Sequence, residues 1–202
     1  RALICRLAND PDFFCELLQL YYKKRHEDVS AKNTPKISPA WAQRLSQLFL
    51  KFKAVPGIDW NGVFHEDAFM NWLKKVKTWA YENDRYEVAM HTVGNGLSYA
   101  STDDDGLFIE QVLCKTLNAS DAEEIRVGYS LGLYNQRGVR FIDPEGKVER
   151  TLAQKYSKAA EKAEGLGYSR YSELLKRISE RYIFEAEQNA LLEHQDEEEY
   201  NN

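Results

Sequence analysis

The segment from Tyr134 to Arg140 is the most unusual in the sequence, because it places two arginines, an amide and a tyrosine around a predicted helix C-terminus. Guanidinium groups bind carboxylates and phosphates through paired, charged hydrogen bonds. The spacing therefore indicates a candidate binding site, whose members are Tyr134, Asn135, Arg137 and Arg140. The same cations can instead cap the last carbonyl groups of a helix and pair with Glu145 or Glu149. The sequence leaves both interpretations open.

Two clusters of basic residues in the first hundred positions are candidates for nucleic-acid binding. They are Lys23, Lys24 and Arg25, and then Lys74, Lys75 and Lys77. These side chains form a surface for a phosphate backbone only if the two clusters lie together in space. A solvated helix face is the alternative interpretation. The net charge of −5 also disfavours nonspecific binding to nucleic acid.

The residue types that commonly bind metals or act in catalysis match no known sequence motif in this chain. The four histidines are His26, His65, His91 and His194, and none belongs to an HExxH pattern. Two turns, which begin at Asp59 and Asp103, partly match a calcium-binding loop. The bidentate carboxylate that such a loop needs at its last position is missing from both, so we expect structural turns. We predict no metal, no other cofactor and no enzymatic activity.

Several local signals mark where helices begin and end. Asp10-Pro11 and Ser38-Pro39 each combine an N-cap residue with a proline suited to the first helical position. Ser120 and Glu123 match a capping box. Gly138 fits the position just after a helix C-terminus, where the left-handed conformation favours glycine. These signals place helix ends along most of the chain.

Apolar residues recur at helical spacing between these ends, which predicts an all-α fold. We expect an irregular bundle of about eight or nine helices, packed as helical hairpins. The short link Gly165–Tyr168 predicts that the chain ends in a long antiparallel helix pair. The glycine pair Gly128 and Gly132 predicts close packing of two helices. The one short candidate strand is Gly138–Ile142.

The distribution of charge bears on the domain organisation. Residues 1–100 carry 14 Lys and Arg against 11 Asp and Glu, whereas residues 101–202 carry 13 against 21. We expect one helical domain over residues 1–192, with a sub-boundary near residues 100–106, where the composition turns acidic. The acidic tail, residues 193–202, is expected to be disordered.

The cysteines and the hydropathy indicate a soluble, intracellular protein. Cys5, Cys15 and Cys114 are too few for a disulfide framework and are expected as free thiols. No apolar run approaches the roughly 20 residues that a membrane-spanning helix needs. Because the chain begins at Arg1 and not at methionine, we expect it to be a segment of a larger protein.

Three stretches together resemble a known region of other proteins. They are Asn9–Phe14 with Leu17 and Tyr22–Arg25, Gly132–Val139, and Glu149-Arg150 through Tyr156 with Arg181-Tyr182 and Glu185-Ala186. This combination resembles an uncharacterised helical C-terminal region of large bacterial multidomain proteins. The resemblance implies a bacterial origin, a cytoplasmic location and a role subordinate to domains upstream. It carries no catalytic residues.

Three functions follow as hypotheses. The leading one is a non-catalytic helical module that mediates protein interaction or regulates other domains of its own chain. The second is a nucleic-acid-associated regulatory or defence domain that uses the basic clusters of the first half. The third is an enzyme with an unrecognised site, near His91 or Arg137.

Overall fold

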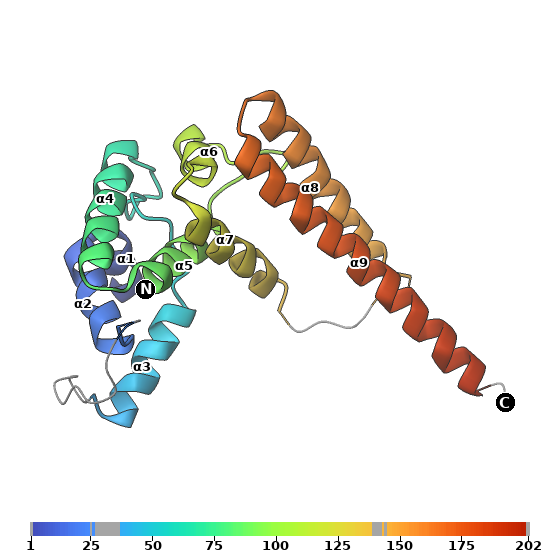
Figure 1. Cartoon of the computed structure of the whole chain (residues 1–202), viewed down its shortest axis with the longest axis horizontal. Helices are drawn as coiled ribbons and strands as arrows, with labels where there is room; N and C mark the ends of the chain where they lie inside the picture. The colour runs from blue at the N-terminus through green and yellow to red at the C-terminus, as the bar shows by residue number, and fades with distance from the viewer. Residues whose placement is uncertain (1, 25, 27–36, 139–142, 144, 201–202) are drawn as a thin grey trace. The chain divides into compact units, whose positions relative to one another are not determined.

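The computed structural model describes residues 2–24, 26, 37–138, 143 and 145–200, with the side chains of residues 192–200 left out. This part of the chain forms nine α-helices and no strand, which confirms the all-α prediction (Figure 1). The candidate strand Gly138–Ile142 lies largely outside the described residues. The helices are α1 (Ala2–Asn9), α2 (Pro11–Tyr21), α3 (Pro39–Leu50), α4 (Glu66–Glu82), α5 (Tyr86–Leu97), α6 (Gln111–Asn118), α7 (Glu123–Gln136), α8 (Lys147–Gly165) and α9 (Ser169–Tyr200).

The chain divides into two compact units. Unit 1 comprises Arg1–Ala100 and Glu123–Leu133, and unit 2 comprises Ser101–Ala122 and Tyr134–Asn202. Helix α7 therefore belongs to unit 1 through Leu133 and to unit 2 from Tyr134 onward. The predicted single domain over residues 1–192 and the predicted disorder of residues 193–202 stay predictions.

The first helices of unit 1 begin where the sequence predicts. The Asp10 carboxylate accepts a hydrogen bond from the backbone N–H of Phe13 at 3.0 Å, and the Ser38 hydroxyl accepts one from Trp41 at 3.4 Å. Each bond satisfies one of the backbone donors that a helix leaves open at its first turn. Both predicted N-caps are therefore confirmed.

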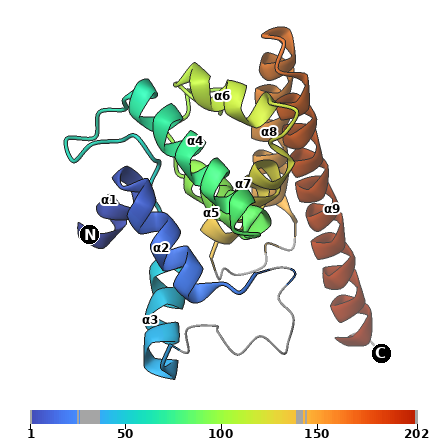
Figure 2. The same ribbon diagram turned by 60° about the vertical axis from the view of Figure 1, so that its left-hand side comes forward.

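A cluster of aromatic rings forms the core of unit 1. Phe14 of α2 is fully buried, and its ring centroid lies 4.9 Å from that of Trp72 and 5.8 Å from that of Phe52. The indole N–H of Trp72 donates to the carbonyl of Leu7 at 3.2 Å. Helix α2 packs against both α1 and α4 (Figure 2).

Helices α5 and α7 approach each other through glycines. A Cβ atom on Gly94 would lie 2.0 Å from the carbonyl oxygen of Ile125, and one on Gly128 would lie 2.1 Å from that of His91. Only glycine allows such an approach of two backbones. A Cβ on Gly132 would likewise lie 2.4 Å from the Ser98 hydroxyl. The close packing predicted from Gly128 and Gly132 is confirmed.

The start of α7 differs from the prediction. The N-cap residue is Ala122, without a side-chain cap, and the predicted capping box of Ser120 and Glu123 is wrong. Ala122 is fully buried, and its N–H closes a turn onto the carbonyl of Ala119 at 3.2 Å. Helix α7 therefore begins beyond Ser120, after the turn between Ala119 and Ala122. The predicted glycine after the helix is confirmed, because Gly138 has a φ of 63°.

Unit 2 is organised around α8 and α9, which run side by side as the predicted antiparallel pair (Figure 1). The Ser172 hydroxyl donates to the carbonyl of Ala160 at 2.9 Å, and the Ser179 hydroxyl donates to that of Ala153 at 2.7 Å. The rings of Tyr156 and Tyr182 stack at 5.6 Å. Small and aromatic side chains thus both contribute to this interface.

Candidate functional site

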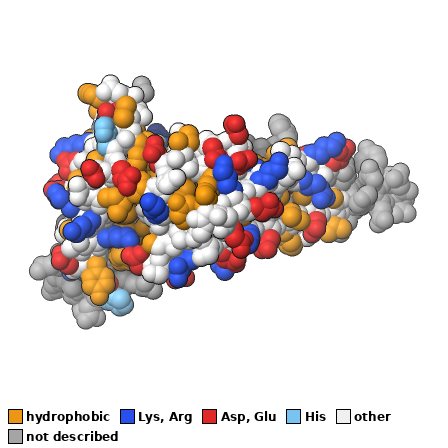
Figure 3. Space-filling view, turned by 90° about the horizontal axis from the view of Figure 1, so that it is seen from above, with side chains coloured by type: hydrophobic (Ala, Val, Ile, Leu, Met, Phe, Trp, Pro, Cys, Tyr) orange, Lys and Arg blue, Asp and Glu red, His pale blue; other side chains and the backbone are white. Residues whose placement is uncertain are grey.

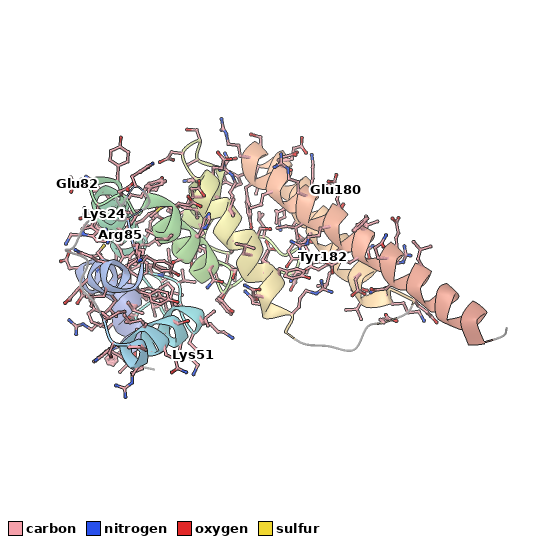
Figure 4. The ribbon with its side chains drawn as sticks, turned by 60° about the horizontal axis from the view of Figure 1, so that its bottom comes forward. Lys24, Lys51, Glu82, Arg85, Glu180 and Tyr182 are labelled. Carbon is pink, nitrogen blue, oxygen red and sulfur yellow. The ribbon has the colours of Figure 1, made fainter. Side chains whose placement is uncertain are left out.

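The guanidinium of Arg137 pairs with two carboxylates of unit 2. It donates to Glu149 at 3.0 Å and to Glu185 at 2.5 Å. The side chain of Arg137 is 11% exposed and that of Glu149 is 1% exposed, so the pair is removed from water. The ring of Tyr182 on α9 (Figure 4) lies 4.6 Å from the guanidinium carbon. The pairing with Glu149, one of the two sequence interpretations, is therefore present.

The other members of the predicted binding site have different surroundings. Tyr134 is 41% exposed, and its ring lies 4.0 Å from the guanidinium of Arg181. Asn135 is exposed, and Arg140 lies outside the described residues. The structure therefore joins Tyr134 and Arg137 in one cluster of rings and charges. Anion binding there stays a prediction, and a bound anion would compete with Glu149 and Glu185 for the guanidinium of Arg137.

The predicted nucleic-acid clusters lie on different elements of unit 1. Lys23 and Lys24 are exposed beyond the end of α2, where Arg85 donates to the carbonyl of Tyr22 at 3.0 Å (Figure 4). On α4, Lys74 and Lys75 are exposed and Lys77 is half-buried. Arg25 lies outside the described residues.

The described surface carries charges of both signs. On the face drawn in Figure 3, lysine and arginine side chains are interspersed with aspartate and glutamate. Nucleic-acid binding through the lysines stays a prediction.

Unit 1 contains an open groove of about 770 Å³ that the sequence did not reveal. One wall is α1, with Ile4, Cys5 and Ala8, and the other comes from the segment after α3, with Val55 and Ile58. The lining is mainly apolar. Long-range folding creates this groove, because its walls lie about fifty residues apart in the chain.

Trp60 lies at this groove with 81% of its surface exposed. It stands in the Asp59–Gly62 turn, where polar residues are usual. A tryptophan in a tight, exposed turn is the one signal that could have drawn attention to this surface. Exposed tryptophans with a neighbouring pocket are typical anchors of protein interfaces.

Two charged residues, Lys53 and Asp59, line the groove, and they differ in how far the chain itself engages them. The ammonium of Lys53 lies 5.5 Å from the ring centroid of Tyr99, and both residues line the groove. The Asp59 carboxylate accepts hydrogen bonds from the N–H groups of Asn61 and Val63, at 2.9 Å each. The bond from Val63 is the largest of the causes that lower the pKa of Asp59. Asp59 is thus committed to its own turn, and Lys53 supplies the groove's available charge.

A histidine and two glutamates meet elsewhere in unit 1. Glu87 and His91 belong to α5 and Glu124 to the first turn of α7, and one ligand atom of each lies within 4.8 Å of the others. His91 Nε2 lies 2.7 Å from a carboxylate oxygen of Glu124. All three side chains are partly exposed. The helical spacing of Glu87 and His91 was readable in the sequence, but the contribution of Glu124 was not.

The two aspartate turns are turns, as predicted. In unit 2, the Asp103 carboxylate accepts hydrogen bonds from the N–H groups of Asp105 and Leu107, at 3.0 Å each. The ammonium of Lys162 then bridges the carboxylates of Asp103 and Asp105, at 2.8 and 2.7 Å. A lysine of α8 therefore supplies the positive charge that these two carboxylates require.

No helix among the described residues is long and apolar enough to cross a membrane. Comparison with known proteins adds no identity: the chain matches no family model, no curated protein and no solved structure. The resemblance to a helical C-terminal region of large bacterial proteins therefore stays a prediction.

Proposed function

We propose that this chain is a non-catalytic helical module that binds a protein partner through the groove of unit 1. The observation that carries the proposal is Trp60, which is 81% exposed beside an apolar groove of about 770 Å³. Exposure of a tryptophan to water is unfavourable, and its burial by a partner would supply a large apolar contribution. The predicted bacterial origin, cytoplasmic location and membership of a larger protein belong to the same proposal.

The chemistry of the groove favours an acidic, apolar segment as its occupant. The apolar walls accept aliphatic or aromatic side chains, and Trp60 lies beside them. Lys53 makes no ion pair among the described residues and points its ammonium toward the ring of Tyr99, at the groove. A carboxylate on the partner would therefore meet Lys53, whereas Asp59 is already engaged by its own turn.

Selection from a library of short displayed peptides on the immobilised chain tests the proposal. The selected peptides should combine apolar residues with Asp or Glu. Their binding should be lost in Trp60→Ala and strongly weakened in Lys53→Glu. Trp41→Ala is the matched control, because Trp41 is 57% exposed in the same unit but does not line the groove.

Two results would count against the groove. If the selected peptides bound the Trp60→Ala variant with the same affinity as the original chain, they would be using another surface. Retention of nucleic acid alone, with affinity that falls steeply as salt rises, would favour the lysines Lys23, Lys24, Lys74, Lys75 and Lys77 instead.

A further inference from the structure

We propose that Glu87, His91 and Glu124 form a binding site for a divalent transition-metal ion, with zinc as the reference metal. Among the described residues, these three form the one group of histidine, cysteine or acidic side chains whose ligand atoms converge in this way. The inference concerns a different surface from the groove and does not depend on the proposed partner binding.

The donor set suits such an ion. A neutral imidazole nitrogen and two carboxylates provide one nitrogen, two oxygens and a charge of −2, which a divalent cation neutralises. Imidazole favours zinc and its neighbours over calcium and magnesium, which prefer oxygen ligands alone. Three protein donors leave a fourth position for water.

The distances between the donor atoms here lie on both sides of the donor–donor distance found around a bound zinc ion. Around a tetrahedral zinc, with ligand bonds near 2.1 Å, donor atoms lie about 3.4 Å apart. Here His91 Nε2 and Glu124 Oε2 are 2.7 Å apart, and no pair among the three ligand atoms exceeds 4.8 Å. Small rotations of side chains that are already partly exposed would therefore admit the ion.

Rigid elements position the donors. Glu87 and His91 are four residues apart on α5, so their side chains share one face of the helix. Gly128 brings α7 into contact with the backbone of His91, since a Cβ there would lie 2.1 Å from the His91 carbonyl oxygen. Glu124 is one helical turn before Gly128 and is thereby held opposite His91. Placement of donors on packed helices favours a preformed site.

The three-residue group at His91 differs from an ordinary pair of one histidine and one carboxylate. His65 and Asp59 form such a pair at 3.2 Å, and no third carboxylate, histidine or cysteine among the described residues joins it at ligand distance. At His91 the third donor, Glu87, converges on the same point. Two carboxylates beside one histidine repel each other, and a cation between them, either the imidazolium itself or a bound metal ion, relieves that repulsion.

Competition titration of the whole chain with zinc against a chromophoric chelator tests the proposal. One equivalent should bind, and equal concentrations of magnesium or calcium should not displace it. Loss of a residue that only hydrogen-bonds a metal ligand weakens metal affinity by about 10–100-fold. Loss of a ligand itself should therefore weaken zinc binding at least tenfold in each of Glu87→Gln, His91→Asn and Glu124→Gln. His65→Asn, the matched control, should leave binding unchanged.

A second measurement needs no variant and so does not depend on how the variants fold. In a long-range ¹H–¹⁵N spectrum, one equivalent of zinc should shift the ring nitrogens of His91 and leave those of His26, His65 and His194 in place. Zinc bound without a shift at His91 would overturn the proposal. Affinity that is the same in all three ligand variants would overturn it as well.

Discussion

At the scale of single residues, the most buried ion pairs among the described residues of unit 2 are those of Arg137 with Glu149 and Glu185. Removal of one partner from a buried ion pair leaves the other charged group without compensation, which costs about 3–5 kcal/mol. We expect Arg137→Met to lower the free energy of unfolding by about that amount, because Glu149 is 1% exposed. Urea denaturation followed by circular dichroism measures the change.

Two further variants serve as controls for this prediction. Arg177→Met removes an exposed pair with Glu173 and should cost less than about 1 kcal/mol. The double variant Arg137→Met/Glu149→Leu replaces the ion pair by apolar groups and should recover much of the loss. If Arg137→Met cost no more than Arg177→Met, the buried charge would have to be stabilised by other groups.

The same residues show what local sequence can predict about a site. The pairing of Arg137 with Glu149 spans twelve residues and was one of two interpretations of the sequence. Glu185 lies 48 residues from Arg137, and Glu124 lies 33 residues from His91. Periodicity and spacing reach over a few helical turns only, so partners contributed by a distant helix appear only in the folded chain.

At the scale of elements, the chain uses one loop design twice. Asp59 and Asp103 each accept hydrogen bonds from N–H groups two and four residues ahead. An isolated bridge closes each loop, between Ile58 and Phe64 in unit 1 and between Thr102 and Phe108 in unit 2. The two loops lie 44 residues apart and are identical at four aligned positions, namely Asp59/Asp103, Gly62/Gly106, Phe64/Phe108 and Glu66/Glu110. The shared hydrogen bonding therefore has a short counterpart in the sequence.

The second loop gives a prediction about pH. The hydrogen bond from Lys162 is the first cause that lowers the pKa of Asp103 below its ordinary value of 3.8. A lowered pKa contributes stability that is present above pH 3.8 and is lost as the pH falls through the pKa of the folded state. We therefore expect Lys162→Met to raise the pKa of Asp103 toward 3.8 and to reduce the stability that this carboxylate adds at neutral pH.

Titration of the side-chain carboxyl carbons by NMR measures this pKa directly. Lys176→Met is the control, because Lys176 pairs with Glu164 and contacts neither aspartate of the loop. An unchanged Asp103 pKa in Lys162→Met would show that the N–H groups of Asp105 and Leu107 alone account for the shift.

Helix ends illustrate why element prediction succeeds in one place and fails in another. Asp10 and Ser38 cap the helices that the sequence assigned to them, because the cap, the proline and the first apolar turn all agree. Ser120 offers an equally good local pattern, yet α7 begins later. Ala122, the residue just before α7, is fully buried, and burial depends on neighbours that a local pattern does not contain.

At the scale of the whole molecule, the two units are interleaved along the chain. The acidic change of composition near residues 100–106 coincides with one border, between Ala100 and Ser101, but unit 1 also needs Glu123–Leu133. That segment contributes Ile125 and Tyr129, which are 0% and 2% exposed. Burial of Ile125 alone contributes about 1.5–3 kcal/mol, a large share of the 5–15 kcal/mol typical of a domain.

Truncation tests this interleaving. A chain of residues 1–100 should lose cooperative thermal unfolding, since the glycine face of α5 would have nothing to pack against. A chain of residues 1–136 should keep it, because it restores all of the part of α7 that belongs to unit 1. Circular dichroism in the near and far ultraviolet during heating compares the two. If residues 1–100 unfolded cooperatively at the same temperature as residues 1–136, the packing of Gly94 against Ile125 would contribute little, and the change in composition would mark a real domain boundary.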